Sequence, residues 1–156
     1  MMRGARPTHI VSMRLDELNL GYDTAFWEKQ RAMDPERGVH QSYELYWIWL
    51  SKPNFLCTAI NLNPFHSDYF AWFDIGYFRT EKYNNDVLIR RTPSRNEVLL
   101  LDVAALMPWI HGKSVGGGFI GGGASILRKW KAEFLAVIEA HKHEFIGKDQ
   151  PFMLKT

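Results

Sequence analysis

The sequence predicts a single α/β domain, in which helices alternate with short apolar strands. Apolar residues recur at helical spacing in several segments, most clearly between Ile126 and His141, where charged side chains lie opposite them. Short apolar runs bounded by turn residues, such as residues 69–75, have the length of strands. A chain of 156 residues can build one domain with a substantial core, so we expect residues 1–156 to form one unit.

Composition argues against nucleic acid as a partner. The chain has 19 Lys and Arg against 17 Asp and Glu, and its short basic clusters have glutamates beside them. The single cysteine, Cys57, cannot form an intrachain disulfide and is expected to be a small buried hydrophobe. No apolar run has the length of a transmembrane segment, and residues 1–13 lack a signal-peptide core. Localisation stays open between the cytoplasm and a membrane reached through regions outside this chain.

The first part of the chain is predicted to be mostly helical. Asp23 is expected to cap a helix that ends at Asp34-Pro35. Another helix is expected to begin around Ser51-Lys52-Pro53, with the proline in its first turn, and to end at Asn63-Pro64. The expected elements are a short strand at 8–13 and helices at 24–33, from about 42 to 50, and at 52–62.

The second part of the chain is predicted to contain strands and one long helix. Residues 69–75 are rich in aromatic side chains and indicate a fully buried strand, whereas residues 79–85 are polar and indicate a surface loop. The expected elements after that loop are a strand at 87–89, a strand or helix at 98–103, a glycine segment at 116–123, a helix at about 126–141 and a helix starting near 149.

Asp74 stands where the strand at 69–75 ends, shortly before Gly76. In open α/β sheets ligands bind just outside the carboxyl ends of strands, so an acid at this place is a candidate for chemistry. Burying such a carboxylate without a partner would be costly. The alternative is an aspartate that caps a turn, since aspartate shortly before glycine is common in turns.

The glycine segment holds six of the chain's 12 glycines. Gly116, Gly118 and Gly121 match the dinucleotide-binding spacing, but Pro108 and Gly112 interrupt the strand that should precede it. A phosphate-binding loop is excluded because no lysine follows the glycines. A backbone with few side chains can approach a sugar or phosphate closely. The alternatives are a flexible loop and a packed strand edge, and Phe119-Ile120 favours the strand.

Asp149 and Gln150 place a carboxylate and an amide at the expected start of a helix. The alternative role for Asp149 is to cap that helix. His141 and His143 are two residues apart, which on a helix does not direct both side chains to one metal ion. We expect them near the end of the long helix, where they interact favourably with its dipole. A serine nucleophile in a sharp strand-to-helix turn is not evident.

Five segments in this order resemble the HtrL/YibB (WlaTC/HtrL) family of glycosyltransferases. The resemblance spans about residues 40–151 and rests on LSKPNF at 50–55, NPF at 63–65, WFDIGYFR at 72–79, GGFIGG at 117–122 and FIGKDQ at 145–150. It implies a GT-A-like nucleotide-diphospho-sugar transferase fold, a mixed sheet flanked by helices. The stretch before Asp74 is short for that fold, so we expect a partial domain that lacks part of the N-terminal nucleotide-binding half.

The resemblance also implies roles for particular residues. In GT-A folds a strand ends in an Asp-x-Asp motif whose carboxylates hold a divalent metal on the donor's diphosphate. The matching triplet here is Asp74-Ile75-Gly76, so glycine replaces the second acid, and Mn²⁺ or Mg²⁺ would be held by Asp74 with phosphate oxygens and water. The implied donor-binding residues are Asp74, Gly76, Arg79, Gly117, Gly118 and Gly121, and the implied catalytic pair near the acceptor is Asp149 and Gln150.

We therefore expect an enzyme of carbohydrate biosynthesis that moves a sugar from a nucleotide-diphospho-sugar donor to a carbohydrate acceptor with divalent metal assistance. In this interpretation Asp149 orients or deprotonates the acceptor hydroxyl. The main alternative is a catalytically degenerate GT-A-like domain that binds carbohydrate or a protein partner without turnover. A nicotinamide-dependent oxidoreductase is a third interpretation, and it requires residues 116–121 to lie at a strand-to-helix turn.

Overall fold

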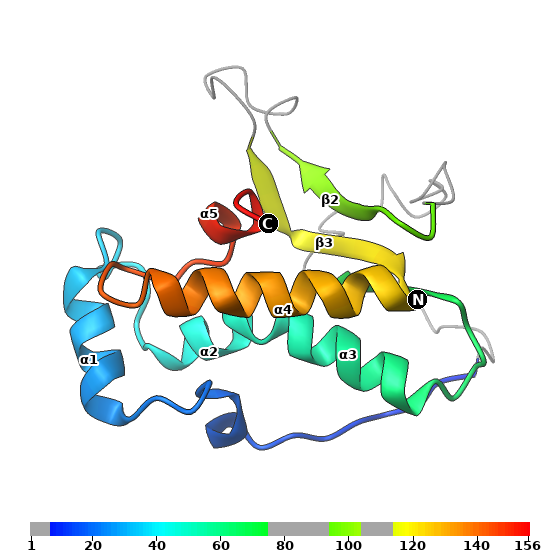
Figure 1. Ribbon diagram of the computed structural model, residues 1–156. Coiled ribbons are helices and arrows are strands. Elements are labelled where there is room, and N and C mark those ends of the chain that lie inside the picture. Colours follow the sequence, from blue (N-terminus) through cyan, green and yellow to red (C-terminus); the bar gives the residue numbers. More distant parts are fainter. Residues whose placement is uncertain (1–6, 75–93, 104–113) are drawn as a thin grey trace, which may run out of the picture.

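The computed structural model describes residues 7–74, 94–103 and 114–156, which form a mixed α/β arrangement of helices on a small antiparallel sheet (Figure 1). The α/β prediction is therefore confirmed at this level. In chain order the elements are the short 3-10 helix η1 (Leu15–Leu18), α1 (Thr24–Met33), α2 (Glu44–Leu50), α3 (Lys52–Leu62), β1 (Tyr69–Phe73), β2 (Val98–Asp102), β3 (Val115–Gly123), α4 (Ala124–Ala140) and α5 (Gln150–Met153).

Local capping explains where α1 begins and where α3 ends. The Asp23 carboxylate accepts a hydrogen bond from the Phe26 N–H at 2.8 Å, so this predicted N-cap is confirmed. Helix α3 ends at Leu62, and its C-cap residue Asn63 is in the left-handed conformation with φ 35°. The Asn63 side chain also accepts from the Ser67 N–H and donates to the Ser67 carbonyl, which closes the turn into β1.

The glycine segment forms β3, the middle strand of the order β1-β3-β2, and both pairings are antiparallel. The packed strand is thus the correct alternative for this segment, and residues 98–102 are also a strand. Gly116 to Gly121 lie inside β3 rather than at a strand-to-helix turn, so the spacing does not form the turn that the nicotinamide interpretation requires. The strand predicted at 87–89 lies outside the described residues.

Two strand predictions need correction. Residues 8–13 are not a strand but an extended segment, and Ile10 is 83% exposed. This segment runs alongside α3, on the side of the helices that faces away from the sheet (Figure 1). Its apolar character alone therefore does not give it a strand to pair with. Strand β1 is half-buried rather than fully buried, because it pairs on one side with β3 and packs only alternate side chains against the helices.

A bulge interrupts the pairing of β2 with β3. Leu100 pairs with Ile120, but the next residue, Leu101, pairs with Gly116. The three residues of β3 between these pairs, Gly117 to Phe119, therefore have no pairing partner on β2. On its other side this part of β3 lies beside the end of β1, where Phe119 pairs with Phe73. This places an irregular stretch of glycine backbone next to Asp74.

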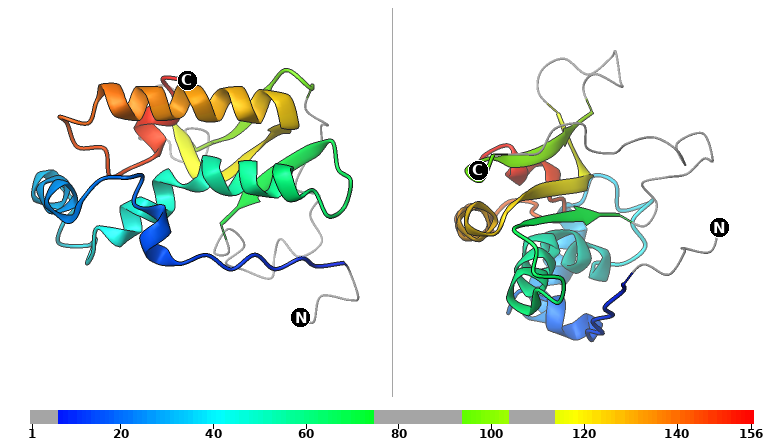
Figure 2. Two further views of the ribbon diagram at one scale, coloured as in Figure 1. Left: turned by 60° about the horizontal axis from the view of Figure 1, so that its bottom comes forward. Right: turned by 90° about the vertical axis from the view of Figure 1, so that its right-hand side faces the viewer.

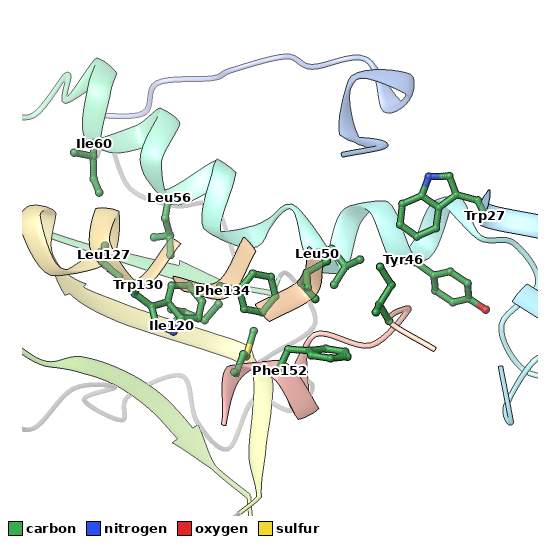
Figure 3. Packing of buried hydrophobic residues seen from close by; sticks show 13 residues of the cluster. Trp27, Tyr46, Leu50, Leu56, Ile60, Ile120, Leu127, Trp130, Phe134 and Phe152 are labelled. Carbon is green, nitrogen blue, oxygen red and sulfur yellow. The ribbon is translucent and has the colours of Figure 1, made fainter. Parts of the chain in front are cut away.

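The core lies between the sheet and the pair α3 and α4, which run side by side in both views (Figures 1 and 2). Trp72, Ile120 and Leu100 are in register on adjacent strands and pack toward these helices. Figure 3 shows the side chains that fill the space between them. The buried cluster comprises Trp27, Tyr46, Leu50, Leu56, Ile60, Ile120, Leu127, Trp130, Phe134, Ile138, Ile146, Phe152 and Met153.

Cys57 is buried and its thiol is free, as predicted. None of the helices in the described ranges combines the length and apolar character needed to cross a bilayer.

Candidate functional site

Lys52, the first residue of α3, is buried with its ammonium group among polar atoms from three other segments. Its Nζ lies 2.8 Å from Oδ2 of Asp149 and donates to the carbonyl oxygen of Gly117 at 2.8 Å. Oδ2 of Asp74 lies 3.7 Å from the same nitrogen. The side chain of Lys52 is only 3% exposed, and a buried ammonium requires such partners. We refer to Lys52, Trp72, Asp74, Gly117 and Asp149 as the Lys52 site.

The local sequence around each residue explains this convergence. Ser51 connects α2 directly to α3, so Lys52 starts a helix deep in the molecule rather than at the surface. The bulge in β3 directs the Gly117 carbonyl to Lys52, and the Gly118 carbonyl accepts from the Asp74 N–H at 3.1 Å. Asp149 immediately precedes α5, which packs against β3.

Glycine at position 117 is required by this packing. A Cβ atom there would lie 2.7 Å from Oδ2 of Asp149 and 2.7 Å from Nζ of Lys52. Real Cβ atoms do not approach other atoms that closely, so any larger residue would displace the ion pair.

Asp149 is buried with its side chain 4% exposed, and this burial raises the pKa of its carboxyl group. Lys52 opposes the shift, as do the backbone N–H groups of Asp149 and Gln150. Asp149 stands at the N-cap position of α5 but makes no side-chain cap hydrogen bond, so capping does not explain its presence. Asp149 and Lys52 form an ion pair through Oδ2 of the carboxylate. Among the described residues, no hydrogen-bond donor is aligned with this oxygen.

Asp74 forms the open side of the site. Its side chain is 42% exposed, and Oδ1 accepts a hydrogen bond of 2.8 Å from the indole N–H of Trp72. The Trp72 ring stacks on Phe55 with ring centroids 5.3 Å apart, which fixes the indole and through it the carboxylate. Trp72 also packs against the core.

The structure brings some of the sequence-predicted residues together and separates others. Asp74, Gly117, Gly118 and Asp149 lie at or beside the Lys52 site. Gly121 faces Ala71 and the ring of Phe119 instead. Gln150 follows Asp149 directly but is exposed at the start of α5. Gly76 and Arg79 lie outside the described residues.

The side chains present do not by themselves fit a divalent metal. Asp74 has one oxygen engaged by Trp72 and the other 3.7 Å from an ammonium group, which would repel a second cation. The described residues contain no group of three or more His, Cys, Asp or Glu side chains placed to hold a metal ion. In this part of the chain the positive charge between the two carboxylates is supplied by Lys52.

Sequence reasoning did not identify Lys52 or Trp72 as site residues. For Lys52 a signal was present, because a cation in the first turn of a helix opposes the helix dipole and needs a compensating anion. For Trp72 the signal was its spacing from Asp74, because residues two apart along a strand lie on the same face.

A cavity of about 280 Å³ lies elsewhere, between β2, α4 and the end of the chain. Its lining combines apolar side chains such as Leu100 and Trp130 with polar ones such as Asn96 and Glu133, and none of the Lys52 site residues is among them. The cavity and the site are therefore separate features.

Comparisons with known proteins identify no relative. No family model, no curated protein and no solved structure matches the chain.

Proposed function

We propose that the Lys52 site belongs to a GT-A-like glycosyltransferase that moves a sugar from a nucleotide-diphospho-sugar to a carbohydrate acceptor. The observation that carries the proposal is the convergence of Asp74, Gly117 and Asp149 on one buried ammonium. These residues come from three separate segments of the HtrL/YibB resemblance, which implied donor-site and acceptor-site roles for them. Their proximity is what a shared site requires.

Asp149 is the group that acts on the acceptor hydroxyl in this proposal. A general base works best when its pKa is near the working pH, and burial moves the pKa of Asp149 upward in that direction. Lys52 favours the ionised form of this carboxylate, opposing the effect of burial, and fixes its position. Oδ2 is buried and receives no aligned hydrogen bond from the described residues.

Asp74 and the glycine backbone form the donor side in this proposal. The half-exposed Asp74 carboxylate is held by Trp72 and can accept hydrogen bonds from sugar hydroxyls. The bulged glycines beside it allow a ligand to approach the backbone closely. The resemblance predicts Mn²⁺ or Mg²⁺ at Asp74, but the described side chains do not fit a metal, so no step here depends on one.

A second candidate function is binding of carbohydrate or a protein partner without turnover. The observation that favours it is the burial of Asp149, whose charge is already neutralised by Lys52. An acid that only stabilises the fold around a binding surface would look the same.

Ligand-linked stability and turnover separate these functions. The protein is incubated with UDP-glucose, UDP-galactose, UDP-N-acetylglucosamine and GDP-mannose, each with Mn²⁺, Mg²⁺ or EDTA. We expect one of them to raise the thermal midpoint, since a ligand at a hundred times its Kd stabilises by about 2.7 kcal/mol. We also expect slow release of the nucleoside diphosphate by hydrolysis.

Three variants assign the activity to the site. Asp74→Asn should weaken donor binding and Asp149→Asn should lower turnover. Asp68→Asn is the matched control, because Asp68 lies at the other end of β1 with its side chain 75% exposed. Stabilisation by a sugar nucleotide with no turnover would favour the binding domain. Unchanged turnover in both site variants, or no response to any sugar nucleotide, would rule out the proposed roles.

A further inference from the structure

A second group of polar side chains, with a buried centre and a partly exposed edge, lies outside the Lys52 site, where the turn after α1 meets α2 and the segment before α5. We call it the Asp34 cluster, and it comprises Asp34, Glu36, His40, Tyr46 and Lys148. Asp34 and Tyr46 are 3% and 0% exposed, and His40 is 8% exposed. Neither composition nor the resemblance assigned these residues a role.

Asp34 is the centre of this cluster. Its Oδ2 accepts from the Tyr46 hydroxyl at 2.5 Å and lies 2.7 Å from Nδ1 of His40. Its Oδ1 accepts from the Glu36 N–H at 2.8 Å. Burial opposes ionisation, but the hydrogen bonds from Tyr46, His40 and Glu36 lower the pKa of Asp34 on balance. A fully bonded carboxylate thus fixes the turn at 34–40 to α2.

Glu36 connects this turn to the segment that carries Asp149. Its Oε2 lies 3.4 Å from Nε2 of His40 and 2.6 Å from Nζ of Lys148. Lys148 is the residue immediately before Asp149. The Glu36 to Lys148 ion pair is only partly shielded from solvent, because the side chain of Lys148 is 29% exposed and that of Glu36 is 51% exposed.

Tyr46 holds the same segment through packing. Its ring meets that of Phe145 edge to face, with centroids 5.6 Å apart. Gly147 fits against both rings, since a Cβ there would lie 3.0 Å from Tyr46 and 2.5 Å from Phe145. Because α2 leads into α3 through Ser51, the unit that contacts residues 145–148 through Tyr46 also contacts Asp149 through Lys52.

We infer that the Asp34 cluster is a positioning device, which fixes the Asp149 carboxylate beside Lys52 by holding Lys148 through Glu36. The effect of this positioning on catalysis rests on the proposed function, in which Asp149 acts on the acceptor hydroxyl. A positioning residue located away from the chemistry can have a large effect, since a misplacement of about 1 Å can reduce the rate by about a hundredfold.

The test compares Lys148→Met, Lys148→Arg and the control Lys142→Met. Lys142 is a nearby lysine whose ion pair with Glu139 is exposed. With the sugar nucleotide that the wild type hydrolyses, Lys148→Met is expected to lower kcat by about tenfold or more, while KM for the donor stays unchanged. Lys148→Arg should restore kcat, and Lys142→Met should match the wild type. Glu36→Gln should reproduce the loss, and the double variant should lose little more than either single one.

Hydrogen exchange gives a readout that does not require activity. The Phe152 and Met153 N–H groups donate to the Asp149 carbonyl at 3.1 and 3.0 Å, so they report on the position of this residue. They should exchange faster in Lys148→Met than in Lys142→Met. Equal exchange in these two variants, or equal kcat, would overturn the inference. A wild type that neither binds nor hydrolyses any sugar nucleotide would instead overturn the proposed function, and the exchange data would still decide the positioning.

Discussion

Asp149 and Asp34 are both buried, but their surroundings shift the pKa values of their carboxyl groups in opposite directions. Burial raises the pKa of Asp149, and Lys52 compensates only in part. For Asp34, burial is outweighed by hydrogen bonds from Tyr46, His40 and the Glu36 backbone, which together lower the pKa. The difference follows from the number of hydrogen-bond donors that reach each carboxylate.

This contrast predicts opposite pH dependences of stability. A carboxyl group whose pKa is raised in the folded state binds its proton more tightly there than in the unfolded chain. Its contribution to the free energy of unfolding is therefore lost as pH rises above about 3.9, the pKa of an aspartate in the unfolded chain. Relative to Asp149→Asn, the wild type should therefore lose stability as pH rises through the window between the unfolded and folded values. Relative to Asp34→Asn, it should lose stability as pH falls below about 3.9.

Urea unfolding of the three proteins between acid and neutral pH measures these differences. The free energy of unfolding of each variant is subtracted from that of the wild type at every pH. Difference curves with the same sign of slope would contradict the assignment of the two environments.

Among the elements, β3 shows most clearly what local sequence can and cannot predict. Phe119 and Ile120 correctly favoured a strand over a loop, because their apolar side chains need a packed face. The bulge at Gly117 to Phe119 was not predictable, since it depends on the pairing of β2 with β3 at a distance along the chain. The helices were predicted well because their caps, such as Asp23 and Asn63, act on nearby backbone groups.

The bulge makes Gly117→Ala a sensitive substitution. The new methyl group would stand 2.7 Å from both Nζ of Lys52 and Oδ2 of Asp149, so these groups must move apart. We expect a loss of about 1–3 kcal/mol in the free energy of unfolding, the usual range for overpacking. Gly38→Ala is the control, because a Cβ at Gly38 meets no atom within 4 Å. Similar unfolding midpoints in urea for the two variants would refute the close packing at Gly117.

For the whole molecule, the α/β class was predictable from periodicity, whereas the connections between distant segments were not. Asp74, Gly117 and Asp149 could be expected to meet only through the resemblance, and Lys52 was expected merely near a helix cap. The predicted strand at 8–13 failed for a related reason, since pairing depends on the position of a partner strand. Long-range polar contacts, such as Lys52 with Asp149, leave no periodic pattern in the sequence.

Gln30 makes another connection of this kind, between α1 and the segment that follows α4. Its buried side-chain oxygen accepts from the Ile146 N–H at 2.8 Å, and its nitrogen donates to the carbonyls of Lys142 and Glu144 at 3.2 and 2.9 Å. One amide thus satisfies three backbone groups of a segment that leads to Asp149. A buried backbone group left without a partner costs about 1–3 kcal/mol.

Gln30→Leu should therefore destabilise the fold by about 1–3 kcal/mol, because leucine fills the space but bonds none of these groups. The Ile146 N–H should exchange much faster with solvent than in the wild type, since its acceptor is gone. Lys29→Leu introduces the same side chain at the adjacent exposed position of α1 and should change neither quantity by much. Urea unfolding and hydrogen exchange measure both effects. Unchanged protection of Ile146 in Gln30→Leu would show that this hydrogen bond does not hold the segment.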